Sequence, residues 1–321
     1  MLLSICAVVV GIAVLAWAAD RFVFGAAATA RNFGVPALMV GLTVVAIATS
    51  MPEMLISAIA SWQGNTGIGI GNALGSNITN IGLILGITAV IKPLKVHSTT
   101  LRRELPILLA ITLVALVLML DGHLRRVDGF LLLLVLVVVM YWLVNLGLRT
   151  RANDPMRSEF DNRVPQNVST ARALGWLVMG LLMLLLSSRA LVWGAVNIAQ
   201  SLGVSDLVIG LTIVAVGTSL PELAASVVSA LRNQPDIAIG TIIGSNMFNL
   251  LAVLGIVGIV HPSAFPAEVL TRDYPAMIGL TLALFAMGYG FRKPGRVNRL
   301  EGGVLLACFV GYQLYLYGKA G

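Results

Sequence analysis

Long apolar stretches separated by short polar connections run through the whole sequence. Read against the positions of Gly, Pro and charged residues, the pattern predicts ten helices able to cross a hydrocarbon layer about 30 Å thick. The helices are expected at residues 2–30, 35–61, 67–91, 104–120, 127–148, 172–200, 204–231, 236–260, 274–290 and 300–318. We therefore predict an all-α polytopic membrane protein, whose first residues form a span and not a cleaved signal peptide.

One hydrophilic stretch, residues 149–171, interrupts this pattern and divides the helices into two groups of five. The expected organisation is a first five-helix unit at 1–148, a short linker at 149–171 and a second five-helix unit at 172–321. The linker is too short to fold as a domain of its own.

The amino-acid composition is also typical of an integral membrane protein. Of its 321 residues, 58% are hydrophobic and only 11% are charged. A soluble domain carries about twice that share of charge. Ordinary soluble enzymes and disordered proteins are therefore excluded. The two cysteines, Cys6 and Cys308, lie in apolar stretches near opposite ends of the chain, and they indicate neither a disulfide framework nor a zinc site.

The basic residues predict the orientation of the helices. Sixteen of the 21 Lys and Arg residues fall in the loops that follow the odd-numbered helices, and four fall on the other side. Because basic residues collect in cytoplasmic loops, both termini are expected outside the cytoplasm, in a plasma (cell inner) membrane. The net charge of +7 then needs no nucleic acid as a partner. Arg189 remains inside the sixth helix, either as a gating residue or as a side chain that snorkels to the interface.

The two halves share a repeated segment. Residues 41–87 and 210–256 align at a constant offset of 169, without a gap, with 20 identities in 47 positions. Both copies contain Thr-Ser-x-Pro-Glu followed by Gly-Ser-Asn-x-x-Asn. The copies lie five helices apart, and an odd number of crossings gives them opposite orientations. Inverted repeats with broken helices at the ion site are typical of secondary transporters.

Two acidic residues, Glu53 and Glu222, lie well inside predicted helices at the same position of each repeat, whereas nearly all the other acids map to loops or helix ends. Placing a carboxylate in the hydrocarbon core of a membrane costs at least about 2.5 kcal/mol of free energy, so such a residue indicates a functional site by default. The alternative is a structural Glu that binds a backbone carbonyl or pairs with Arg189. Pro52 and Pro221 should break or kink each helix beside the acid and free backbone carbonyls there, although a plain kink is also common in membranes.

Polar residues surround these acids at helical spacing. Ala46, Thr49, Ser50 and Ser57 share a face with Glu53, and Ala215, Thr218, Ser219 and Ser226 recur around Glu222. The next helix of each repeat supplies a second polar face, with Ser76, Asn77 and Asn80 in the first copy and Ser245, Asn246 and Asn249 in the second.

This set of ligands contains oxygen only. Carboxylate, hydroxyl and carbonyl oxygens suit hard cations such as Ca²⁺ and Na⁺, and they argue against zinc, copper or iron. Two carboxylates balance one divalent ion or two monovalent ions. Competition of both cations for one site that opens alternately to each side would produce exchange.

The repeated segments closely resemble the α-repeats of the sodium/calcium exchanger family of cation/Ca²⁺ antiporters, in a short, prokaryotic-type form without the large regulatory domain. The motifs that carry the resemblance are GLTVVAIATSMPE with GNALGSNITN, and GLTIVAVGTSLPE with GTIIGSNMFN. The resemblance implies Na⁺/Ca²⁺ antiport by alternating access, with the first and sixth helices moving against the others.

Carried over residue by residue, the resemblance implies that Glu53 and Glu222 supply the carboxylates for Ca²⁺ and that Na⁺ uses the same carboxylates. Thr49 and Thr218 would lend backbone oxygens. The remaining implied ligands are Ser50, Ser219, Ser76, Ser245, Asn80 and Asn249, with possible carbonyls from Ala46 and Ala215. Some family members carry Asp where this chain has Asn249, a difference linked with K⁺ co-transport. Asn249 therefore weakens a K⁺-dependent interpretation and leaves proton coupling open.

Three other functions are weighed against this one. The nearest is a Ca²⁺/H⁺ or other cation/proton antiporter on the same scaffold, because protons could compete for buried carboxylates. A cation channel usually places its pore on a symmetry axis between subunits, which one chain with two inverted sites does not favour. An intramembrane hydrolase would need a catalytic pair or triad that the predicted helices do not offer. We expect a transporter and not an enzyme, without a cofactor or an obligate protein partner.

Overall fold

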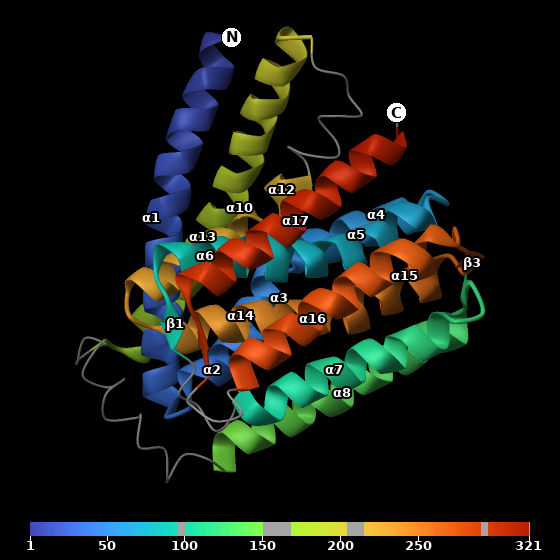
Figure 1. The fold of residues 1–321 in the computed structure, drawn as a ribbon. Coiled ribbons are helices and arrows are strands. Elements are labelled where there is room, and N and C mark those ends of the chain that lie inside the picture. Colours follow the sequence, from blue (N-terminus) through green and yellow to red (C-terminus); the bar gives the residue numbers. More distant parts are fainter. Residues whose placement is uncertain (96–100, 150–167, 204–214, 290–294, 321) are drawn as a thin grey trace.

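The computed structural model describes residues 1–95, 101–149, 168–203, 215–289 and 295–320, and almost all of them are helical (Figure 1). Helices occupy the described part of each of the ten predicted ranges. The residues of the predicted linker from 150 to 167, and residues 204–214 with the start of the second repeated segment, lie outside this description.

Most of the predicted helices are subdivided by breaks or by π-helical turns. The segments of the first half are α1 (Leu2–Phe33), α2 (Ala37–Val40), η1 (Gly41–Val45), α3 (Ala46–Thr49), α4 (Met51–Trp62), α5 (Thr66–Thr79), η2 (Asn80–Leu85), α6 (Gly86–Ile91), α7 (Leu101–Met119) and α8 (Arg126–Arg149). Those of the second half are α10 (Thr170–Ser201), α12 (Ala215–Thr218), α13 (Leu220–Leu231), α14 (Pro235–Phe248), η5 (Asn249–Val253), α15 (Leu254–Val260), η6 (Val269–Asp273), α16 (Tyr274–Tyr289) and α17 (Arg299–Ala320).

Within the described residues, six helices are long and apolar enough to cross a membrane, or seven if a bent pair counts as one span. The bent pair is Leu38–Thr49 with Met51–Trp62, at an angle of 42°. Two shorter apolar helices, Glu104–Met119 and Leu220–Leu231, accompany them. The chain is therefore a multi-pass membrane protein.

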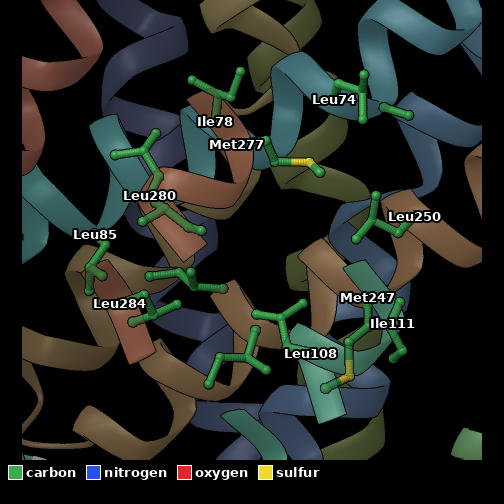
Figure 2. Close-up of a cluster of buried hydrophobic side chains, with 14 of the residues drawn as sticks. Leu74, Ile78, Leu85, Leu108, Ile111, Met247, Leu250, Met277, Leu280 and Leu284 are labelled. Atoms are coloured by element: carbon green, nitrogen blue, oxygen red, sulfur yellow. The ribbon is translucent and has the colours of Figure 1, made fainter. Parts of the chain in front are cut away.

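Two of the long helices form the centre of the molecule. In their most apolar stretches, 72% of the residues of Thr66–Ile91 and 89% of those of Pro235–Val260 are buried, against 17% to 28% in the other four. These two helices carry the predicted Ser/Asn faces. Apolar side chains from them pack with residues of α7 and α16, as the labelled Ile78, Met247, Ile111 and Met277 show in Figure 2. The central helices are thus held by apolar contacts on the sides that do not carry polar residues.

Helices α1 and α10 lie side by side and run in opposite directions (Figure 1). Their closest contacts are reciprocal under the offset of 169. A Cβ on Gly11 would lie 3.1 Å from Leu191, and one on Gly180 would lie 2.6 Å from the backbone of Phe22. Since Gly180 is Gly11 plus 169, and Leu191 is Phe22 plus 169, the two contacts are the same contact made twice. The internal similarity therefore extends beyond the segments 41–87 and 210–256.

Four two-residue strands also join the two halves of the chain. Strand β1 (Leu94–Lys95) pairs with β4 (Arg296–Val297), and β2 (His123–Leu124) pairs with β3 (Ser263–Ala264), both antiparallel. Strands β1 and β3 are equivalent at the offset of 169. Each half thus lends one strand to each small sheet, and β1 and β3 lie at opposite ends of the helices in Figure 1.

The α1–α10 contact yields the first testable prediction. Replacing Gly180 by Ala would force a methyl group against the backbone of Phe22. Such overpacking typically costs about 1–3 kcal/mol, so we expect the Gly180→Ala protein to unfold at a lower temperature in detergent. Gly175→Ala, on the same helix but exposed and with no described atom within 4 Å, should not lower the midpoint. Equal midpoints for the two variants would contradict the close packing at Gly180.

Candidate functional site

Both helices that carry the predicted acids are broken beside them. In the first half the break lies at Ser50, between α3 and α4, and in the second half it lies at Ser219, between α12 and α13. Pro52 and Pro221 occupy the first turn of the helix that follows, where a missing N–H costs nothing. The predicted proline breaks are therefore confirmed, each two residues before the proline.

Glu53 and Glu222 lie in the first turn of the two helices after these breaks, and both are buried, with 1% and 2% of their surface exposed. The Ser50 hydroxyl donates to Oε1 of Glu222 across 3.4 Å, so the break in the first half touches the acid of the second half. The structure thus brings together the two carboxylates that the sequence places 169 residues apart.

The predicted ligands supply an unusual number of buried oxygen atoms that accept or donate no hydrogen bond. A buried polar atom without a partner costs about 1–3 kcal/mol, so a native protein keeps few of them. Here they include Oε2 of both carboxylates, the hydroxyls of Ser219 and Ser245, and Oδ1 of both Asn80 and Asn249. Such a concentration of acceptor oxygens is what a cation needs.

Asn80 and Asn249 lie at matching positions in the two central helices, and each begins a π-helical turn. The amide of Asn80 donates to Oδ1 of Asn246 at 3.0 Å, and that of Asn249 donates to Oδ1 of Asn77 at 3.0 Å. Both bonds join the two halves of the chain. π-Helical turns often mark functional sites, and the sequence pattern did not predict them.

The other predicted ligands are distributed around these groups. Thr49, Ser50, Ser76 and Ala46 are buried in the first half, and Ser219 and Ser245 in the second. Thr218 is half-buried, and only the backbone of Ala215, at the start of α12, is described. Gly244, next to Ser245, packs against the first half so closely that a Cβ on it would lie 2.6 Å from that of Ala46. Residues of the second central helix therefore reach the broken helix of the first half.

The kind of cation follows from the donors. Among the residues that the structure describes, no three His, Cys, Asp or Glu side chains gather in one place. Two carboxylates with hydroxyl and amide oxygens favour Ca²⁺ or Na⁺ over softer metals.

Comparison with known proteins agrees with this chemistry. The sodium/calcium exchanger protein family model matches residues 3–145 and 172–318. The protein CaxA of Alkalimonas amylolytica is 47% identical over 99% of this chain and 100% of its own length. The inner membrane protein YrbG of Escherichia coli is 38% identical over 99% and 98%. A structure of the sodium-calcium exchanger NCX_Mj at zero Na⁺ and Ca²⁺ superimposes with a TM-score of 0.84 and 35% identity, covering 98% of this chain and 99% of that one.

This chain belongs to the sodium/calcium exchanger family.

In this exchanger, several residues that the sequence pattern left out support the acids. The Ser188 hydroxyl of α10 donates at 2.9 Å to the carbonyl of Gly217, which Pro221 leaves without a helical partner. Asn72 of α5 donates to the carbonyl of Glu53 at 3.1 Å and to Ser57 at 2.9 Å. Neither has a counterpart of the same type under the offset of 169, where Ala19 and Thr241 stand. Repeat matching therefore could not reveal them.

The sequence pattern also did not predict the surroundings of two other acids, Glu104 and Asp273. Glu104, at the start of α7, is fully buried, and Asp273, at the end of η6, accepts from Tyr312 at 2.8 Å and pairs with Arg272. The two acids correspond at the offset of 169, which was the available signal. Arg189, in contrast, is exposed on α10, and Cys6 and Cys308 are free and exposed.

The Ser188 bond yields a second prediction. Ser188→Ala would leave the buried Gly217 carbonyl beside the helix break unpaired, at a cost of about 1–3 kcal/mol. We expect a lower unfolding temperature of the exchanger in detergent.

The neighbouring Ser187 is the matched control for this experiment. Its hydroxyl binds carbonyls of its own helix, at 2.6 Å to Met183 and 3.1 Å to Leu184, and such bonds add little stability. Ser187→Ala should therefore change the midpoint less than Ser188→Ala. The reverse order would show that the Ser188 bond does not support the break.

Proposed function

We propose that this chain is a secondary active transporter that exchanges Na⁺ for Ca²⁺ across the membrane by alternating access. The observation that carries the proposal is the buried pair Glu53 and Glu222, one from each half, with unpaired oxygens around it. Membership of the sodium/calcium exchanger family supports the same conclusion.

The ion site that we propose contains the two acids and the oxygen donors next to them. Glu53 and Glu222 would balance the charge of one Ca²⁺ or of two Na⁺ ions. The other proposed ligands are Ser50, Ser219, Ser76, Ser245, Asn80 and Asn249, with backbone oxygens of Thr49, Thr218, Ala46 and Ala215. Ca²⁺ takes six to eight oxygen ligands, and this set is large enough to supply them and still offer separate positions to Na⁺.

Exchange follows from competition for the carboxylates. Without a cation, two neighbouring negative charges in the membrane interior repel each other and are poorly solvated. The site is therefore stable only when it is loaded, by Ca²⁺ or by Na⁺. A carrier that changes its orientation only when loaded couples the movement of one ion to the return of the other.

The architecture that we propose is two inverted five-helix repeats, at 1–148 and 172–321, joined by a cytoplasmic linker at 149–171, with ten membrane crossings. Contacts between loops support it, because they join only loops that this topology puts on the same side. Strand β1, after the third helix, pairs with β4, after the ninth. Lys92 of the third loop likewise binds Asn233 of the seventh at 2.6 Å.

The opposite side shows the same agreement. Strands β2 and β3, after the fourth and eighth helices, pair with each other. Thr66, after the second helix, donates to the carbonyl of His261, after the eighth, at 3.3 Å. Ser201, after the sixth helix, lies against Met1. Each of these contacts fits alternating crossings, and the excess of Lys and Arg then favours odd-numbered loops in the cytoplasm and both termini outside.

We place the transporter in the plasma (cell inner) membrane, with the lipid bilayer as its surroundings and Ca²⁺ and Na⁺ as its substrates. The name of the inner membrane protein YrbG, which aligns with nearly the whole chain, supports this location. We propose no cofactor, no nucleic acid and no obligate protein partner. Helices α1 and α10 pack mainly against each other, so the pair is suited to move as a unit against the other helices.

Neutralising either acid tests the site. Glu53→Gln and Glu222→Gln keep the size of the side chain but remove the charge that balances Ca²⁺, so each should abolish Na⁺-dependent Ca²⁺ uptake into proteoliposomes. Glu268→Gln, at an exposed position, should transport normally. Full uptake by either buried variant would remove that residue from the ion site.

The driving ion separates this proposal from proton-coupled exchange. We expect Ca²⁺ uptake into proteoliposomes to follow an imposed Na⁺ gradient at constant pH, because Na⁺ needs the hydroxyl and amide oxygens that the site provides. An imposed pH gradient without Na⁺ should drive little uptake. Uptake that follows the pH gradient and ignores Na⁺ would favour the Ca²⁺/H⁺ antiporter instead.

A further inference from the structure

The four asparagines of the central helices form two bonds between the halves of the chain, and only two of the four offer an unpaired oxygen. Asn80 and Asn249 each keep a buried Oδ1 without a partner, whereas Oδ1 of Asn77 and of Asn246 is occupied. We propose that Asn77 and Asn246 are positioning residues that turn the amides of Asn249 and Asn80 so that their oxygens face the cation. The proposal rests on the proposed ion site and adds to it two residues that touch no ion.

The orientation of Asn77 is imposed by the backbone. Its amide donates to the backbone carbonyl of Asn246 at 3.3 Å. A carbonyl accepts and cannot donate, so the nitrogen of Asn77 must face it and the oxygen must point the other way. That oxygen accepts the amide of Asn249 at 3.0 Å.

The same logic then fixes Asn249. If its amide turned over, two oxygens would face each other across the bond and both would lose a buried hydrogen bond. Asn249 therefore directs its nitrogen to Asn77 and leaves Oδ1 free. A backbone carbonyl of the second half thus sets, through Asn77 of the first half, the direction of a ligand in the second half.

The second pair repeats this arrangement between Asn246 and Asn80, with a donor distance of 3.0 Å. It is the weaker of the two, because the amide nitrogen of Asn246 has no partner among the described residues. The first pair should consequently contribute more to ion binding than the second.

Because their surroundings are buried, the hydrogen bonds between the asparagines determine which way the amides point. All four asparagines are at least 98% buried, and Asn77 lies against the sulfur of Met277, within the apolar cluster of Figure 2. Because the site is apolar on that side, a turned amide would lose its hydrogen bond without gaining one from solvent. The regular α-helix does not fix the direction of these two amides, since Asn80 and Asn249 both begin π-helical turns.

The test is a set of double-mutant cycles in the full-length protein, with Na⁺-driven Ca²⁺ uptake and the Ca²⁺-induced rise in unfolding temperature as two readouts. Asn77→Ala should raise the Ca²⁺ concentration for half-maximal uptake about tenfold, the loss of one well-oriented hydrogen-bonded group, with a maximal rate within about twofold. Asn249→Ala should raise it at least as much. The double variant Asn77→Ala/Asn249→Ala should match Asn249→Ala alone, because Asn77 acts through Asn249.

Two comparisons complete the design. Asn77→Ala combined with Asn80→Ala should multiply the two single effects, since Asn77 does not hold Asn80. Asn145→Ala, whose amide donates to the carbonyl of Tyr141 in its own helix, should leave the half-saturating concentration unchanged. If Asn77→Ala does not fold, Asn77→Ser and the reciprocal cycle of Asn246 with Asn80 give the same test.

The outcomes separate this inference from the proposed function. Multiplicative effects of Asn77→Ala and Asn249→Ala, or a lower unfolding temperature with unchanged Ca²⁺ response, would overturn the positioning role while transport remains intact. Absence of Na⁺-driven uptake by the unmodified protein would overturn the proposed function, and the Ca²⁺-induced shift in unfolding temperature would still decide whether Asn77 acts through Asn249.

Discussion

The burial of two carboxyl groups, Glu53 from one half and Glu222 from the other, is the constraint on which the rest of the structure depends. Charges in a low-dielectric interior are stable only when they are paired and hydrogen-bonded. The Ser50 hydroxyl donates to Oε1 of Glu222 at 3.4 Å, while Oε2 of both carboxyl groups has no partner among the described residues. A cation is therefore the natural missing partner. In the proposed ion site, the broken helices, the unpaired oxygens and the asparagine bonds would all supply or orient acceptors for that cation.

Duplication explains how one chain can assemble such a site. Each half supplies an acid, a proline break and a central helix with Ser and Asn. Contacts join the halves reciprocally at Gly11 and Gly180, and four short strands pair between the halves. The resulting site belongs to neither half. It also departs from perfect symmetry, because Ser188 and Asn72 support one half each. Two halves with slightly different support are suited to two alternating states of unequal stability.

The sequence predicted the helices, the breaks and the acids because each has a strong local signal. Apolar length indicated the helices, proline indicated the breaks at Ser50 and Ser219, and the rarity of charge made Glu53 and Glu222 stand out. The π-helical turns at Asn80 and Asn249 had no such signal, since their φ and ψ angles differ little from those of an α-helix. The roles of Asn77 and Asn246 depend on contacts between segments 169 residues apart, which a motif cannot express. The burial of Glu104 likewise has no local signal, because the residue stands at the end of a predicted helix, where acids are usually exposed.

The central claim is that Ca²⁺ and Na⁺ compete for one site shared by the two halves. The most direct test is Ca²⁺ binding to the purified protein across a Na⁺ titration. Rising Na⁺ should weaken the apparent affinity for Ca²⁺ without lowering the number of Ca²⁺ ions bound at saturation, and Glu53→Gln/Glu222→Gln should bind none. Ca²⁺ binding that is indifferent to Na⁺, or that persists in the double variant, would contradict the account.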